Sequence, residues 1–122
     1  IESDTSATAD ARRNFADFPN VHIHGGEVAR VLTQIKRADV VVLDPPREGA
    51  GKEVIAKIVG IRPRAIAYVA CDPAALARDT VYLQDNGFSL NQLRAFDLFP
   101  MTHHVECVAL FETSQKGENE VS

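Results

Sequence analysis

The stretch Ala65-Ile-Ala-Tyr-Val-Ala-Cys-Asp-Pro73 decides the fold. Its first six residues are apolar or aromatic, as in a strand buried on both faces, and the run then stops at a cysteine. Asp72 is suited to cap a following helix, and Pro73 fits its first turn because proline's fixed φ is helical there. Cys71 is therefore predicted at the carboxyl end of a parallel strand, where open α/β sheets place their ligands.

Predicted strands and helices alternate along most of the chain. The patterns predict helices over 7–17, 27–36, 52–59 and 74–86, and strands over 21–24, 38–43, 65–70, 88–97 and 104–112. This order predicts an α/β protein with a mostly parallel, doubly wound sheet and helices on both faces. No helix separates the last two strands, so we expect them to form an antiparallel hairpin at one edge. The polar residues 113–122 are expected to form a disordered tail.

Composition narrows the functional classes. A formal net charge of -4 over 122 residues argues against a broadly basic nucleic-acid surface. Two cysteines do not make a disulfide scaffold, so a reducing cytoplasm is the expected location. No apolar run approaches the roughly 20 residues that a membrane span requires.

Two chemically active side chains follow neighbouring predicted strands. Asp44 ends one strand and Cys71 ends the next, and adjacent strands of a sheet lie about 5 Å apart. An acid and a thiol are thus expected to face one pocket. The alternatives are that Asp44 is a turn or capping residue and that Cys71 is a small buried apolar side chain, as most free cysteines are.

Glu106 is a carboxylate inside an otherwise apolar strand. Burial of an acid costs several kcal/mol unless it is paired or protonated, and such a group is suited to proton transfer. The alternative is that Glu106 lies at a solvated strand start. His103 and His104 are not accompanied by a third ligand at suitable spacing, so no metal site is expected.

Three motifs together resemble those of the RNA (uracil-5-)-methyltransferase family. They are Asp44-Pro-Pro-Arg-x-Gly49, Tyr68-Val-x-Cys71-x-Pro73-Ala-x-Leu-Ala-Arg-Asp79 and Phe99-Pro-x-Thr102-x-His104-Val-Glu106. The resemblance runs from Ile1 to about Phe111. It implies the Rossmann-like class I methyltransferase fold, S-adenosyl-L-methionine as cofactor, and methylation of carbon 5 of a uridine in tRNA or rRNA.

The resemblance also implies roles for individual residues. Cys71 matches the nucleophile that adds to carbon 6 of the uracil, and Glu106 matches the base that removes the proton from carbon 5. Asp44 matches an acid that helps to hold the flipped-out base. Thr102 and His104 are expected to shape the wall of the pocket.

Cofactor contacts are expected from a second set of residues. Glu2 resembles the acid at a strand end that binds the ribose hydroxyls, and Glu27 lies roughly where a polar residue reads the adenine edge. Asp44, at its strand end, is assigned to the cofactor as well as to the substrate.

Two departures from the family pattern affect these expectations. Asp72 stands where asparagine is usual, and its negative charge beside the thiol disfavours the thiolate. No glycine-rich first strand precedes Ile1, so we expect residues 1–112 to be the C-terminal portion of a methyltransferase domain, truncated at the N-terminus and inactive alone. The missing first strand would leave the edge of Val40–Leu43 unpaired, and we expect that edge to recruit a second copy.

Two other functional classes fit parts of the sequence. A phospho-acceptor signalling domain would use Asp44 as acceptor, but it leaves Cys71 and Glu106 unexplained. A non-catalytic RNA- or protein-binding module on the same fold is the principal alternative, because of Asp72 and the expected truncation.

Overall fold

The computed structural model describes residues 1–99 and 104–114, with side chains up to residue 96 and from residue 106 onward. These residues fall into two compact units, Ile1–Lys36 and Arg37–Ser122, each of which is described by itself. Within the described part of the chain, no helix combines the length and the apolar character needed to cross a bilayer.

The first unit contains two helices, α1 (Thr5–Asn14) and α2 (Val28–Leu32). Asp4 caps α1 by accepting hydrogen bonds from the backbone N–H groups of Ser6 and Ala7. The helix therefore begins two residues earlier than predicted, because Asp4 is the capping residue.

The predicted strand over 21–24 and the predicted length of the second helix were wrong. The backbone at Gly25 forms only an isolated parallel bridge with Glu2, in which Glu2 donates to the His24 carbonyl and Gly26 donates to the Glu2 carbonyl. A strand needs a partner along its length, and here the partner extends over a single residue. Helix α2 ends at Leu32 rather than at residue 36.

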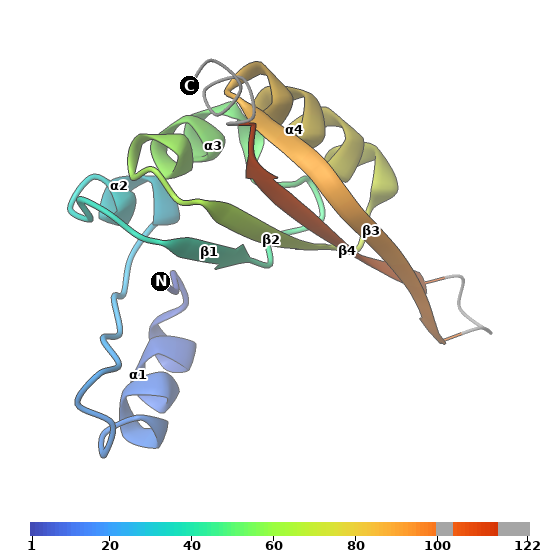
Figure 1. Ribbon diagram of the computed structural model, residues 1–122. Coiled ribbons are helices and arrows are strands. Elements are labelled where there is room, and N and C mark those ends of the chain that lie inside the picture. Colours follow the sequence, from blue (N-terminus) through green and yellow to red (C-terminus); the bar gives the residue numbers. More distant parts are fainter. Residues whose placement is uncertain (100–103, 115–122) are drawn as a thin grey trace. The chain divides into compact units, whose positions relative to one another are not determined.

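The second unit is built on a four-stranded sheet (Figure 1). Its strands are β1 (Val40–Leu43), β2 (Ala65–Ala70), β3 (Phe88–Phe99) and β4 (His104–Thr113), in the order β1-β2-β4-β3. Strands β1 and β2 are parallel, and β4 is antiparallel to both β2 and β3. The C-terminal antiparallel hairpin is thus confirmed, and β4 takes in Thr113, which had been expected to start the tail.

Helices α3 (Gly51–Gly60) and α4 (Pro73–Asp85) lie side by side on one face of this sheet (Figure 1). The covered face carries the core. Alternate residues of β2 and β4 are buried there as cross-strand pairs: Ile66 with Phe111, Tyr68 with Ala109, and Ala70 with Cys107.

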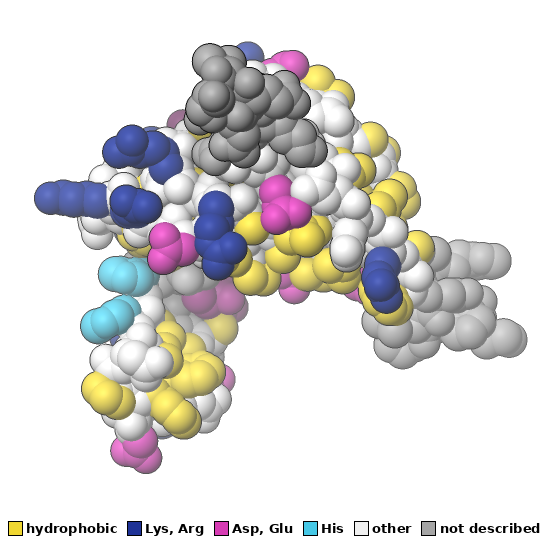
Figure 2. Space-filling model, viewed as in Figure 1, with side chains coloured by type: hydrophobic (Ala, Val, Ile, Leu, Met, Phe, Trp, Pro, Cys, Tyr) yellow, Lys and Arg dark blue, Asp and Glu magenta, His cyan; other side chains and the backbone are white. Residues whose placement is uncertain are grey.

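The opposite face of the sheet is not covered by a helix of this unit, and we call it the open face. Val40 and Val42 of β1 are 47% and 71% exposed on it, so this face of β1 is not buried. Ala67 and Val69 of β2 are only half-buried. Figure 2 shows hydrophobic side chains along the strands on the side away from α3 and α4.

Helix ends follow the expected residues in one case and not in the other. Gly87 follows α4 with φ 90°, a left-handed value that favours glycine. Gly60 was expected to end α3, but it is the last residue of the helix, and Arg62 has the positive φ of 55° instead.

Candidate active site

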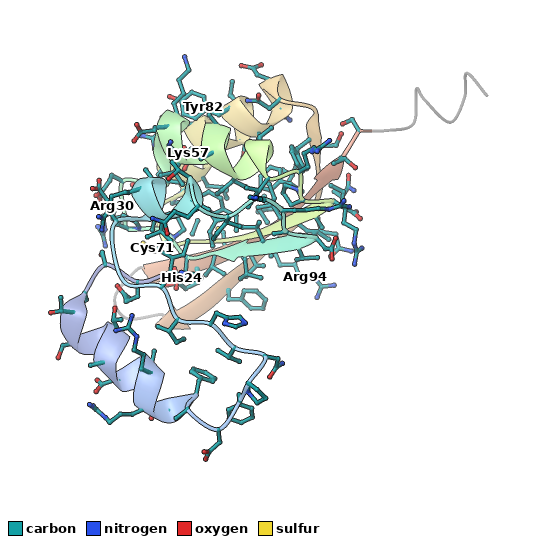
Figure 3. All side chains as sticks on the ribbon, turned by 90° about the vertical axis from the view of Figure 1, so that its left-hand side faces the viewer. His24, Arg30, Lys57, Cys71, Tyr82 and Arg94 are labelled. Carbon is teal, nitrogen blue, oxygen red and sulfur yellow. The ribbon has the colours of Figure 1, made fainter. Side chains whose placement is uncertain are left out.

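The ends of β1 and β2 lie next to each other, as predicted. The parallel register pairs Leu43 with Tyr68, so Asp44 leaves its strand beside the strand that leads to Cys71. Asp44 is exposed and Cys71 is a half-buried free thiol at the turn into α4 (Figure 3). A carboxylate and a thiol therefore follow the carboxyl ends of neighbouring parallel strands.

The register of β2 with β4 brings Cys71 and Glu106 to the same end of the ladder. The last pair of this ladder is Ala70 with Cys107, so Cys71 directly follows the last paired residue of β2 and Glu106 directly precedes its partner on β4. Residues directly opposite in an antiparallel pair project to the same face with Cβ atoms about 5 Å apart. The pair Ala70 and Cys107 belongs to the covered face, so Glu106, the neighbouring residue of β4, falls on the open face, and Cys71 lies at the turn directly after β2.

Glu106 combines a strand position with partial access to solvent. It pairs with Phe96 of β3, which is 42% exposed, and its own side chain is half-buried. A carboxyl group in this setting is reachable by a substrate while one side is shielded by apolar neighbours. This arrangement suits a group that exchanges a proton with a bound molecule.

Asp72 caps α4, as predicted. Its carboxylate accepts a hydrogen bond of 3.0 Å from the backbone N–H of Ala74, and Pro73 occupies the first turn. The cap fixes the direction of the chain immediately after Cys71. The side chain that departs from the family pattern thus has a local structural role.

A buried polar cluster lies on the covered face beside these strand ends. Tyr68 and Asp79 are both 0% exposed, and the Tyr68 hydroxyl donates a 2.5 Å hydrogen bond to Asp79 Oδ2. Asp79 also accepts from the backbone N–H groups of Ala50 at 2.7 Å and Gly51 at 3.3 Å. Burial, and then the hydrogen bond and the charge of Asp79, raise the pKa of Tyr68 well above its ordinary range.

Arg78 and Gly49 complete this cluster. The Arg78 guanidinium donates to the Glu48 carbonyl at 2.5 Å and lies 3.2 Å from Asp79 Oδ1. Gly49 has φ 90°, and a Cβ there would come within 2.7 Å of the side chains of Arg78 and Asp79. Only glycine fits this position without displacing the cluster.

The sequence motif contained Asp79, but sequence reasoning gave it no role. A usable signal was present, because α4 buries Ala75, Leu76, Asp79 and Leu83, and this spacing defines one helical stripe. A carboxylate on such a stripe must be paired or protonated. Its partners could not be named from the sequence, since Ala50 lies 29 residues away and contributes only backbone.

Two of the residues expected to bind the cofactor, Glu2 and Glu27, lie in the first unit, whereas Asp44 lies in the second. The bridge between Glu2 and Gly25 brings the Glu2 backbone next to Gly25-Gly26, which Glu27 follows as the N-cap residue of α2. Both glutamates are exposed, and the Glu2 carboxylate accepts a 3.0 Å hydrogen bond from Asp4 N–H. An exposed carboxylate can accept hydrogen bonds from the two hydroxyls of a ribose.

The remaining predicted residues cannot be placed. Thr102 lies outside the described residues, and of His104 only the backbone, at the start of β4, is described. Among the residues with described side chains, no group of three or more His, Cys, Asp or Glu is arranged to hold a metal ion.

Comparison with known proteins shows which family this sequence matches. Residues 27–114 match the family model described as tRNA (Uracil-5-)-methyltransferase. An uncharacterized RNA methyltransferase of Streptomyces avermitilis is 57% identical over 96% of the chain and 28% of its own length. One of Caldanaerobacter subterraneus is 45% identical over 92% of the chain and 26% of its own length. The chain thus spans about a quarter of these relatives.

Solved structures agree with the fold. The Pyrococcus abyssi tRNA (uracil-54, C5)-methyltransferase, in complex with S-adenosyl-L-homocysteine, superposes with a TM-score of 0.74 at 33% identity. The match covers 89% of this chain and 27% of that one. Precorrin-6y C5,15-methyltransferase of Geobacter metallireducens gives a TM-score of 0.70 at 14% identity, over 92% of this chain and 64% of that one. These likenesses confirm the predicted Rossmann-like class I methyltransferase fold.

Proposed function

This chain belongs to the tRNA (uracil-5-)-methyltransferase family, and we propose that the full-length protein carrying it methylates carbon 5 of a uridine in tRNA or rRNA. The observation that carries the proposal is the β2–β4 register, in which Cys71 and Glu106 each lie one residue beyond the last pair, Ala70 with Cys107. A thiol and a carboxyl group are the two groups that this chemistry needs.

S-adenosyl-L-methionine supplies the methyl group when it is bound. The Glu2 carboxylate accepts hydrogen bonds from the ribose hydroxyls, and Glu27 contacts the adenine edge. The P. abyssi relative was solved with the demethylated form of this cofactor, which supports the assignment. We assign Asp44 to both the cofactor and the substrate.

Cys71 makes carbon 5 of the uracil nucleophilic. Its thiolate adds to carbon 6, and the electron pair of the 5,6 double bond moves into the ring as an enolate. Carbon 5 then takes the methyl group, and Glu106 removes the proton from carbon 5. The electrons of that C–H bond restore the double bond as the bond from carbon 6 to sulfur breaks.

The uracil must leave its base stack to reach Cys71, because the thiol lies at a turn that a stacked base cannot approach. Asp44, at the neighbouring strand end, holds the flipped base by accepting from its N–H. Thr102 and His104 shape the wall of the same pocket.

The test uses RNA that contains 5-fluorouridine, with the full-length protein and cofactor. Fluorine cannot be removed as a proton, so the enzyme stalls as a covalent protein–RNA adduct that survives denaturing electrophoresis. We expect peptide mapping to place the adduct on Cys71. Cys71→Ala should form none, and Cys107→Ala is the matched control that should retain it, because Cys107 is buried in the core.

The opposite result would identify a different class of protein. If the wild-type protein forms no adduct, and Cys71→Ala binds RNA as the wild type does, the protein is a non-catalytic RNA-binding module. Parallel reactions with tRNA and with large-subunit rRNA transcripts distinguish the two substrate classes.

We further propose that residues 1–112 are the C-terminal portion of the methyltransferase domain and lack turnover by themselves. Strand β1 is an edge strand of the described sheet, and Val42 on it is 71% exposed. Unpaired edges recruit strands, so residues 1–122 expressed alone should dimerise through β1. A monomeric mass in solution, with the β1 amides protected from hydrogen exchange, would contradict this.

Two free cysteines fit a cytoplasmic location.

A further inference from the structure

The Asp79 carboxylate joins three separate parts of the second unit. It lies on α4, accepts from the Tyr68 hydroxyl of β2, and accepts from the backbone N–H groups of Ala50 and Gly51 where α3 begins. A fully buried carboxylate is costly unless all of its neighbours donate to it, and here they do. The cluster is therefore a specific junction and not a chance contact.

Asp79 acts as the N-cap of a helix to which it does not belong. The N-cap residue of α3 is Ala50, whose side chain cannot accept a hydrogen bond. The first N–H groups of a helix need acceptors, and an anion there also favours the helix dipole. Asp79, 29 residues further along the chain than Ala50, supplies both the hydrogen-bond acceptor and the negative charge.

Both ends of the loop that carries Asp44 are linked to Tyr68. Its first end follows Leu43, which pairs with Tyr68 in the parallel ladder. Its last end is Ala50, which is bound by Asp79 and through it to the Tyr68 hydroxyl. Between these ends, Arg78 holds the Glu48 carbonyl.

Tyr68 and Asp79 also lie on the two elements that flank Cys71, the proposed nucleophile. Tyr68 lies three residues before Cys71 on β2, and Asp79 lies on the helix that starts directly after Cys71. A shift of the end of the Asp44 loop, at residues 48–50, relative to the Cys71 turn therefore breaks or stretches a hydrogen bond to Arg78 or Asp79.

We propose that Asp79, together with Tyr68, is a positioning residue that fixes the Asp44 loop against the Cys71 turn. The inference rests on the proposed function, since Asp44 is the group that holds the uracil there. Asp79 touches no substrate. It acts through Asp44, and its loss misplaces the base relative to the thiol.

The experiment is a double-mutant cycle in the full-length protein, measured well below the unfolding temperature of each variant. Asp79→Asn should lower kcat/KM for RNA by about 10- to 100-fold, because a misplacement of about 1 Å costs this much. In an Asp44→Ala background the same change should cost less than about threefold, since the positioned group is gone. Asp85→Asn, an exposed acid on the same helix, is the matched control and should stay within about twofold.

Tyr68→Phe repeats the cycle if Asp79→Asn fails to fold. It removes one hydrogen bond and leaves the backbone donors in place, so the expected loss is about three- to tenfold, again only when Asp44 is present. Tyr82→Phe on α4 is its control (Figure 3).

Two results would overturn the inference. One is wild-type kcat/KM in folded Asp79→Asn, and the other is an equal loss with and without Asp44, which would mark a merely structural role. If one of these results is obtained and the wild-type protein forms the 5-fluorouridine adduct, only the positioning role of Asp79 is refuted. If it forms none, the proposed function fails and the inference falls with it.

Discussion

The covered and open faces of the β2–β4 pair use the same two strands for different purposes. On the covered face, Tyr68 is fully buried and its hydroxyl is bound to Asp79. On the open face, Glu106 is half-buried and reachable, and Cys71, at the turn directly after β2, is half-buried as well. Because side chains alternate along a strand, rigid support and reactive groups lie within one strand spacing of each other.

This difference shows how a reactive site can be held firmly without being closed. Among the described side chains, no buried nitrogen or oxygen lacks a hydrogen-bond partner. In the second unit, the buried pair Tyr68 and Asp79 lies on the covered face, next to the backbone that presents Cys71. Variants in the apolar core of the covered face should therefore change mainly stability, variants of the Tyr68–Asp79 pair should also change activity, and variants on the open face should change mainly activity.

The largest expected effect is on the open face. Cys71→Ala should lower methyl transfer by about 10⁴-fold or more, as is usual when a nucleophile is lost. Its free energy of unfolding should change by less than about 1 kcal/mol, because the side chain is only half-buried. Tritium transfer from labelled cofactor and urea unfolding measure the two quantities. A Cys71→Ala protein that unfolds readily would remove the distinction between the faces.

The second effect is on the covered face. Phe111→Ala should lower the free energy of unfolding by about 3–5 kcal/mol, since the ring is fully buried and leaves a cavity. Leu93→Ala on β3, where Leu93 is 55% exposed, is the control and should cost less than about 1 kcal/mol. Urea unfolding of both variants tests this, and equal losses would contradict the core assignment.

Glu106→Gln should slow turnover by about 10²- to 10⁴-fold, the usual contribution of a general base. Addition of Cys71 and methylation do not require this base, so an adduct with ordinary uridine RNA should accumulate on denaturing gels. Glu112→Gln, an exposed acid further along β4, should turn over normally. Slow turnover without accumulated adduct would assign Glu106 to an earlier step.

The smallest effect concerns pH. The pKa of Tyr68 is raised in the folded state, so its contribution to stability is complete below the unfolded value of about 10. Above that pH the unfolded state loses its proton first, and stability should fall by at most about 1.4 kcal/mol per pH unit. Tyr68→Phe should show a shallower alkaline loss in urea unfolding at stepped pH, whereas Tyr82→Phe should keep the wild-type slope. Identical slopes in all three proteins would contradict the buried hydrogen bond.

Local signals in the sequence were reliable where the deciding contacts are only a few residues apart. Asp72 and Pro73 start α4, and Gly87 follows its end, because capping groups act within about three residues. The order of strands and helices, the closing hairpin and the grouping of Asp44 with Cys71 at adjoining strand ends followed from the same signals. The prediction of a strand at Val21-His-Ile-His24 was wrong because alternation alone does not supply a partner strand.

The sequence by itself determined the α/β class, the turn at Cys71 and the residue types that point to uracil methylation. Only the tertiary structure decided which residues of β2 and β4 pair, that β1 has an exposed face, and that Asp79 caps a helix 29 residues away. The physical reason is the range of the interactions. Caps and periodicity act between neighbours in the chain, whereas register, burial and the pairing of a buried charge depend on segments that meet only after folding.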